Sequence, residues 1–128
     1  MNVLDEQVRA DQRLLLSGSR IPFRQIGKDI APSGIKDPNI IPFLHGLKRP
    51  TLFTRDHGFF RSELVHEGYC LVWLATSDIE VARYIRRLLR HRRFDSWRKR
   101  MGLVVRVGQH RIDFWERGQP LLQHVEWQ

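Results

Sequence analysis

The chain has 128 residues, which fits one domain over residues 1–128 that buries a core without a disulfide or metal to hold it. Its hydrophobic content of 41% and charged content of 28% are ordinary for globular proteins, and no apolar run reaches the roughly 20 residues that span a bilayer. The single cysteine, Cys70, excludes an internal disulfide framework, and the early charges argue against a signal peptide. We therefore expect a cytoplasmic protein without membrane contact.

The net charge of +8 is the strongest feature of the composition. A basic excess of this size favours an anionic partner, either nucleic acid or an acidic protein, and a membrane surface less well. The alternative is a solvated basic surface that has no partner.

The first half of the chain alternates expected strands and helices. The expected elements are a strand over residues 1–5, a helix over 7–17, a strand over 21–26, a loop over 27–37 and a helix over 37–47. Asp37 suits the N-cap of the last helix and Pro38 its first turn, whereas Pro42 fits this helix poorly.

The second half continues the alternation. The expected elements are a strand over residues 51–56, a short helix over 59–68, a strand over 69–76, a helix over 77–91, and a strand pair at 102–108 and 111–116. Ser77 or Asp78 can cap the helix over 77–91, and the nearly continuous apolar run at 69–76 is typical of a strand covered on both faces. The last twelve residues show no clear pattern.

This order of elements predicts an α/β fold with a mostly parallel central sheet, helices on both faces and an antiparallel C-terminal hairpin at one edge. Ligands of such sheets bind beyond the carboxyl ends of the strands, where the strand order reverses. The first and third strands are neighbours at that point if the second strand lies on the other side of the first. Asp5 and Asp56, which end these two strands, would then share one crevice.

Further carboxylates follow the same pattern. Asp37 could reach this crevice from the start of its helix, and Glu6 and Asp29 are additional candidates. Converging carboxylates repel one another unless a cation lies among them. Hard oxygen ligands without His or Cys select Mg²⁺ or Mn²⁺, which can activate water against a phosphodiester.

Each acid also has a purely structural alternative. Asp37 can be a helix cap, and Asp5 can cap the loop between its strand and the next helix. Asp56 can pair with Arg55 or begin the following helix. Spacing alone leaves both interpretations open.

Three segments resemble the motifs of a small PIN-like group of predicted nucleases, which often occurs as the toxin of bacterial toxin–antitoxin pairs. They are "MNVLDEQV", "GIKDPNII" and "TLFTRDHGFF", in the family's order and spacing and within about residues 1–76. The resemblance matches Asp5 to the first metal-binding aspartate, Asp37 to the second acidic position and Asp56 to the third. It implies a three-layer α/β/α PIN-like fold, a divalent metal and cleavage of RNA.

The chain departs from the family's pattern at several positions. An asparagine of the family is replaced by Gln7, and acids that often follow the second and third aspartates are replaced by Pro38, Asn39, Gly58 and Phe59. The site therefore keeps the three matched aspartates and Glu6.

The stretch from 83 to 100 is rich in arginine, and we expect it to form a helix that positions RNA. Spacings of three and four place Arg83, Arg87 and Arg90 on one helical face, and with Arg86 and Arg55 they are candidates for contact with phosphates. The same face could dock an acidic antitoxin segment or remain solvated. Trp97 could stack on a base or pack internally.

A dimer or partner surface could also be covered by residues near the C-terminus: Trp115, Leu121 and Trp127. A homodimer is therefore left open.

These observations lead to two main hypotheses. The first is a metal-dependent PIN-like ribonuclease, the toxin of a toxin–antitoxin pair, in which Asp5, Asp37 and Asp56 hold Mg²⁺ or Mn²⁺ with support from Glu6. The second is a non-catalytic PIN-like protein that binds nucleic acid or an acidic protein partner through its arginine-rich helix. A phosphate-handling enzyme of another class lacks support because there is no glycine-rich phosphate loop.

Overall fold

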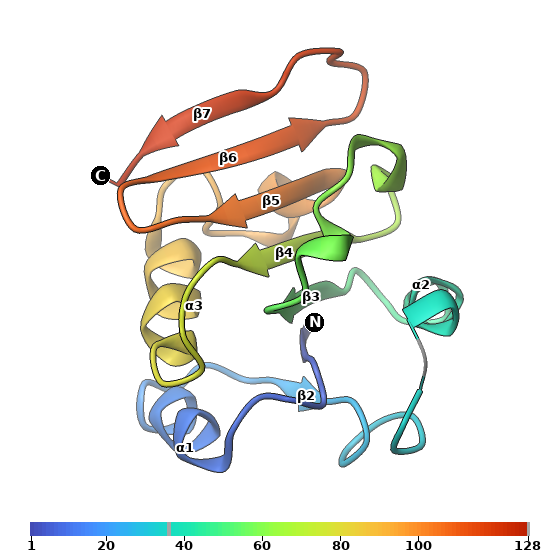
Figure 1. The fold of residues 1–128 in the computed structure, drawn as a ribbon, viewed down its shortest axis with the longest axis vertical. Coiled ribbons are helices and arrows are strands. Elements are labelled where there is room, and N and C mark those ends of the chain that lie inside the picture. Colours follow the sequence, from blue (N-terminus) through green and yellow to red (C-terminus); the bar gives the residue numbers. More distant parts are fainter. Residues whose placement is uncertain (36, 128) are drawn as a thin grey trace.

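A computed structural model describes residues 1–35 and 37–127, and of Asp37 only the backbone. Within this part of the chain, seven strands form one sheet in the order β2-β1-β3-β4-β5-β6-β7 (Figure 1). The strands are β1 (Asn2–Leu4), β2 (Arg24–Gln25), β3 (Thr51–Thr54), β4 (Cys70–Leu74), β5 (Leu103–Val107), β6 (Arg111–Glu116) and β7 (Gln123–Glu126). The helices are α1 (Ala10–Gly18), α2 (Asp37–His45), α3 (Val81–Arg90) and α4 (Trp97–Arg100), with 3₁₀ turns η1 (His57–Phe59) and η2 (Ser62–Leu64).

The strand order reverses at β1, because β2 lies on one side of it and β3 on the other. Val3 in β1 pairs in parallel with Arg24 of β2 on one side and with Leu52 of β3 on the other. The sheet continues in parallel through β4 and β5, whereas β6 and β7 are antiparallel to their neighbours. The prediction of a mixed α/β fold with a mostly parallel sheet is therefore confirmed.

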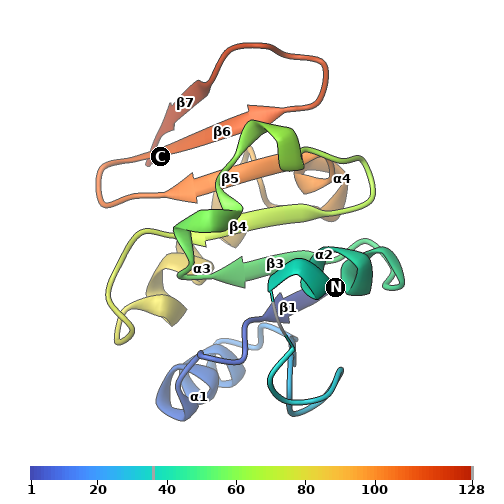
Figure 2. The ribbon, with the colours of Figure 1, turned by 45° about the vertical axis from the view of Figure 1, so that its right-hand side comes forward.

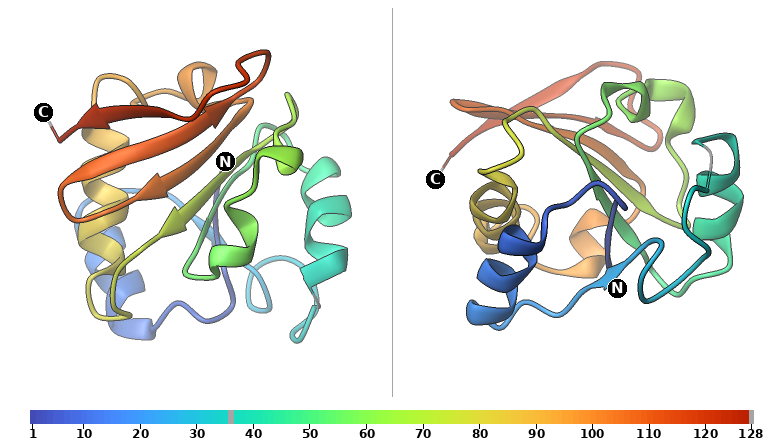
Figure 3. Two further views of the ribbon diagram at one scale, coloured as in Figure 1. Left: turned by 45° about the horizontal axis from the view of Figure 1, so that its top comes forward. Right: turned by 60° about the horizontal axis from the view of Figure 1, so that its bottom comes forward.

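Apolar side chains cover both faces of the sheet. In β3, Leu52 joins the core on the side of α2, and Phe53 joins the core on the side of α1 and α3. Leu71 and Val72 alternate in the same way in β4. This is the two-residue period of strands buried on both faces, and Figure 3 shows α1 and α3 on one side of the sheet and α2 on the other.

The N-terminal end of α3 differs from the prediction. The helix begins at Val81, and neither Ser77 nor Asp78 caps it; its N-cap residue, Glu80, makes no side-chain cap. Instead, the backbone N–H of Ala82 donates to Oε1 of Gln12 in α1, at 2.9 Å. A side chain from a distant helix therefore supplies the cap, which a local pattern cannot reveal.

Two other helical predictions are wrong. The short helix expected over 59–68 is replaced by η1 and η2, separated by extended backbone at Arg61. The arginine-rich stretch is not one helix, because α3 ends at Arg90 and the backbone is extended at His91, before Ser96 caps the separate helix α4 through the N–H of Lys99.

The C-terminal residues form β7, which the sequence does not reveal. Its residues alternate between partly buried and exposed, and pairing with β6 completes the strand. Trp127, just beyond β7, donates from Nε1 to the carbonyl of Gly108 at 2.9 Å, so it packs within the chain, while Leu121 is 77% exposed. None of the described helices is long and apolar enough to cross a membrane.

Cys70 lies at the start of β4 and is fully buried, as expected. Burial raises the pKa of its thiol to about 12. At neutral pH the side chain therefore stays protonated and acts as a small apolar residue.

Candidate acidic site at the carboxyl edge of the sheet

Asp5 and Asp56 follow neighbouring parallel strands, at the edge where β1, β3 and β4 end, which we call the carboxyl edge. Figure 2 shows the arrowheads of β3, β4 and β5 at this edge. Oδ2 of Asp5 accepts a hydrogen bond of 2.7 Å from the hydroxyl of Thr54, and the same hydroxyl accepts from the backbone N–H of Asp56 at 3.1 Å. One threonine at the end of β3 therefore connects the Asp5 carboxylate to residue 56.

The carboxylate of Asp56 begins the turn that follows. Its Oδ1 accepts from the backbone N–H of Gly58 at 2.9 Å, and Nδ1 of His57 lies 3.9 Å from the same oxygen. A Cβ at position 58 would lie 3.1 Å from this oxygen. Glycine at this position therefore allows the backbone to approach the carboxylate closely.

A groove of about 620 Å³ lies beside Asp56. Its lining comes from the first turns of α2, at Pro38, Ile41 and Pro42, and from the region of η1 and η2, including Asp56 and Arg61. The start of α2 therefore faces Asp56 across this groove.

The three aspartates that the sequence predicts as metal ligands are only partly described. The side chain of Asp37, the first residue of α2, lies outside the described part of the structure. Asp5 and Asp56 lie near each other, connected through Thr54. Among the side chains that the structure describes, no three of His, Cys, Asp or Glu come together as a metal-binding group.

Glu6 holds the loop that leads toward α2. Its carboxylate accepts from the hydroxyl of Ser33 at 2.5 Å and from the backbone N–H of Gly34 at 2.8 Å. These two hydrogen bonds, that of Ser33 first, lower the pKa of the Glu6 carboxyl. Gly27, with φ +85°, lets this carboxylate pack closely, because a Cβ there would lie 3.0 Å from it. Glu6 therefore supports the site by ordering the loop.

Asp29, the remaining acidic candidate, closes the turn after β2. Its Oδ2 accepts from the backbone N–H of Gln25 at 2.9 Å. Its carboxylate thus has a structural role, because it satisfies a backbone donor four residues earlier in the chain.

Two residues that organise the site do not stand out in the sequence: Thr54 and Gln25. The Gln25 side chain is fully buried, and its Nε2 donates to the carbonyls of Asp5 and Val8 at 3.0 Å each. Arg13 donates to its Oε1 at 2.8 Å. A buried amide that is satisfied in this way holds the backbone after β1 in place. The only available signals are a glutamine next to Ile26 in the expected strand over 21–26 and a hydroxyl two residues before Asp56.

The predicted phosphate-binding arginines divide into groups. Nε of Arg55 donates to the carbonyl of Thr76, after β4, at 2.9 Å. Arg83 and Arg87 border a cavity of about 600 Å³ that is also lined by Thr76 and His110. These three arginines therefore continue the carboxyl edge from β3 toward the turn between β5 and β6.

The contacts of the helix α3 limit how freely its arginines can move. Arg83 pairs with Glu80 at 3.0 Å, and the Arg87 guanidinium lies 3.9 Å from the ring centre of Trp127. Arg86 donates to the hydroxyl of Ser19 at 3.0 Å, which ties α3 to the end of α1. Arg90 is exposed and borders a separate hollow with His91 and Trp127.

The fold and the site define a mixed α/β domain with two aspartates at the carboxyl edge, where the order of parallel strands reverses. Comparison of the chain with protein-family models, with curated proteins and with solved structures finds no match in any of the three. The function is therefore argued from the fold and from the side chains that gather at this edge.

Proposed function

We propose that the protein is a metal-dependent ribonuclease of PIN-like type, built on a three-layer α/β/α arrangement. The observation that carries the proposal is the connection of Asp5 to Asp56 through Thr54, between β1 and β3. In open α/β sheets this is the position at which ligands bind. Asp37, at the start of α2, would complete the acidic set.

The chemistry of these residues fits Mg²⁺ or Mn²⁺. Carboxylate oxygens are the ligands that such hard cations prefer, and the Thr54 hydroxyl and the Gly58 N–H hold one oxygen each of Asp5 and Asp56 in fixed orientation. When bound, the ion would supply an activated water and neutralise charge at the phosphodiester. The role of the two aspartates is to bind and orient the ion.

The positive charge of the chain supports RNA as the substrate. Arg55, Arg83 and Arg87 lie along the same edge as the aspartates, on the side of β4 and β5, so they would contact phosphates on one side of the scissile bond. The net charge of +8 would hold the polyanion over the acidic site. As the toxin of a toxin–antitoxin pair, the protein would bind an antitoxin whose acidic segment covers these arginines.

A non-catalytic protein that binds nucleic acid or an acidic partner is the second candidate. The observation that favours it is that Asp56 and Glu6 both accept hydrogen bonds from the backbone of turns and loops. Carboxylates with such structural roles persist in a protein that has lost its metal.

Cleavage of RNA in the presence of Mn²⁺ distinguishes the two functions. We expect Asp5→Asn and Asp56→Asn each to lower the rate by about 100-fold or more, because each removes a charge that holds the ion. Asp11→Asn is the matched control, because this aspartate is exposed and pairs with Arg9 at 3.0 Å. Equal cleavage rates for the wild type and for the variants of Asp5 and Asp56 would contradict the nuclease function. If calorimetry detects no binding of Mn²⁺ to the wild type, the second candidate is favoured.

A further inference from the structure

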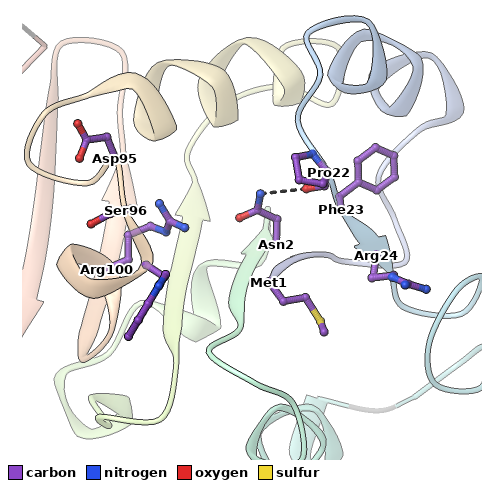
Figure 4. Close-up of a pocket in the computed structure, with 9 residues that line it drawn as sticks. Met1, Asn2, Pro22, Phe23, Arg24, Asp95, Ser96 and Arg100 are labelled. Carbon is purple, nitrogen blue, oxygen red and sulfur yellow. Dashed lines mark hydrogen bonds between the residues drawn. The ribbon is translucent and has the colours of Figure 1, made fainter.

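A pocket of about 440 Å³ lies at the opposite end of the parallel strands, which we call the amino edge (Figure 4). Its lining comes from the start of β1, from the residues that lead into β2 and from the region of α4. Its volume is within the range of about 300–1,000 Å³ that is usual for small-molecule sites. The proposed nuclease site makes no use of this pocket.

Arg100, in the wall of the pocket, is a buried cation. Its side chain is 7% exposed, and it donates to the hydroxyl of Thr51 at 3.1 Å and to the carbonyl of Phe94 at 2.7 Å. Both partners are neutral, and within the described residues no ion pair includes Arg100. The one acid of the pocket, Asp95, pairs with Lys99 at 2.8 Å. Burial lowers the pKa of Arg100, and the nearby charge of Asp95 offsets this only in part.

Asn2 contributes a second incomplete polar group. Its Nδ2 donates to the carbonyl of Pro22 at 3.0 Å, while its Oδ1 is buried and, within the described residues, has no hydrogen-bond partner. In Figure 4 this oxygen points to the side of the pocket on which Arg100 lies. Buried acceptors without a donor are rare in proteins, so a ligand with an N–H group that enters between Asn2 and Arg100 would be favoured.

The remaining lining is aromatic, apolar and basic. Phe23 and Pro22 form one wall, and Trp97 contributes its indole. The guanidinium of Arg49 lies 3.7 Å from the centre of this ring. Arg24 is exposed at the rim. A flat ring would pack against the aromatic side chains, and an anionic group would reach the arginines.

We propose that the amino-edge pocket binds a nucleotide, either a free mononucleotide or the terminal unit of a nucleic-acid strand. The base lies between Trp97 and the wall of Pro22 and Phe23 with an amino group directed to Asn2, and the phosphate binds Arg100. Arg24, at the opposite rim (Figure 4), adds positive charge that attracts the anion. A nucleotide is the ligand class that combines a flat ring, N–H donors and an anion. The proposal is independent of the metal site and of the nuclease activity.

Calorimetric titration of the full chain with AMP tests this proposal. We expect Arg24→Ala to weaken binding about threefold, because it removes a positive charge at the rim that attracts the anionic ligand. Arg61→Ala is the matched control, since it removes an exposed arginine from the groove at the carboxyl edge, and Asp5→Asn is the control for the acidic site. Both controls should bind AMP with the affinity of the wild type. Arg100→Lys should also weaken binding, provided that its circular dichroism matches the wild type.

The source of the nucleotide is decided by a second set of probes. One outcome is that a short RNA with a 5′-phosphate competes with AMP and binds more tightly than the same RNA with a 5′-hydroxyl. The pocket then binds the end of a nucleic-acid strand. If AMP binds more tightly than either RNA, the pocket binds a free nucleotide. No binding of AMP or of either RNA at millimolar concentration overturns the proposal. The proposal is also overturned if the Arg24→Ala variant binds with wild-type affinity, or if affinity is lost in the Asp5→Asn variant alone.

Discussion

The two ends of β3 hold groups of opposite charge, one at each edge of the parallel sheet. At the carboxyl edge, Asp5 and Asp56 meet around Thr54. At the amino edge, the buried Arg100 is held by Thr51, and Arg49 stacks on Trp97 nearby. A strand of four residues, β3, thus has one threonine that donates to an anion and another that accepts from a cation.

This contrast shows how a small sheet can separate two kinds of ligand site. A hydroxyl can donate or accept, so the same residue type serves both edges, and the neighbouring charge determines its role. The carboxyl edge suits a divalent cation, whereas the amino edge suits an anion. Each of the following experiments changes one edge, and the two threonine variants are compared with each other.

Among these changes, the largest effect is expected from Thr54→Val. This change removes the donor to Asp5 and the acceptor for the N–H of Asp56, so the two aspartates lose their connection. We expect RNA cleavage with Mn²⁺ to fall by about 10–100-fold, as for other groups that orient metal ligands. Single-turnover cleavage measures the rate, and an unchanged rate in a folded Thr54→Val variant would show that the connection has no role in activity.

Arg100→Met is expected to act on stability at the amino edge. The substitution leaves the Thr51 hydroxyl and the Phe94 carbonyl without their buried donor, which costs about 1–3 kcal/mol in the free energy of unfolding. Part of this cost is offset because an uncompensated buried charge is also removed. Urea unfolding measures the change, and a variant more stable than the wild type would show that desolvation of the guanidinium outweighs its hydrogen bonds.

Thr51→Val is the matched partner of Thr54→Val on the same strand. Thr51 is fully buried and accepts from Arg100, so its loss should cost about 1 kcal/mol in the free energy of unfolding. RNA cleavage should stay at the wild-type rate, since the acidic site lies at the other edge. A fall in cleavage as large as that of Thr54→Val would mean that the two edges are coupled.

The smallest effect is expected at Glu6 and depends on pH. Its hydrogen bonds with Ser33 and Gly34 lower its pKa from the ordinary value of 4.5, so its ionised form stabilises the folded state. This contribution is present above the pKa of the unfolded chain and is lost as pH falls through the lower pKa of the folded protein. Glu6→Gln should therefore lower Tm slightly at pH 7, with the difference from the wild type shrinking below about pH 4. A difference in Tm that is independent of pH would contradict this origin.

Part of the acidic site could be predicted without coordinates. Asp5 and Asp56 each follow an apolar stretch, and the alternation of strands and helices requires parallel strands whose carboxyl ends lie at one edge. The sequence made β1 and β3 neighbours only on the condition that β2 lies on the other side of β1, and the structure meets this condition. Thr54 could not be assigned its role, because a hydroxyl in a strand has many local uses and its partners here lie 49 residues away and two residues away.

Contacts between distant segments account for the features that the sequence does not reveal. The cap of α3 comes from Gln12, the strand β7 exists through its pairing with β6, and the pocket at the amino edge joins residues from β1 and α4. A local pattern contains no information about such partners, because each side chain is compatible with several environments.

The sequence by itself determined the class of fold, the mostly parallel sheet and the edge at which Asp5 and Asp56 lie, because hydrophobic periodicity and chain order constrain these strongly. Only the tertiary structure decided which side chains complete each edge: Thr54 and Gln25 at the carboxyl edge, Thr51 and Arg100 at the amino edge. The physical reason is that a buried polar group takes whichever partner folding brings within hydrogen-bond distance, and that partner is set by the packing of the whole sheet.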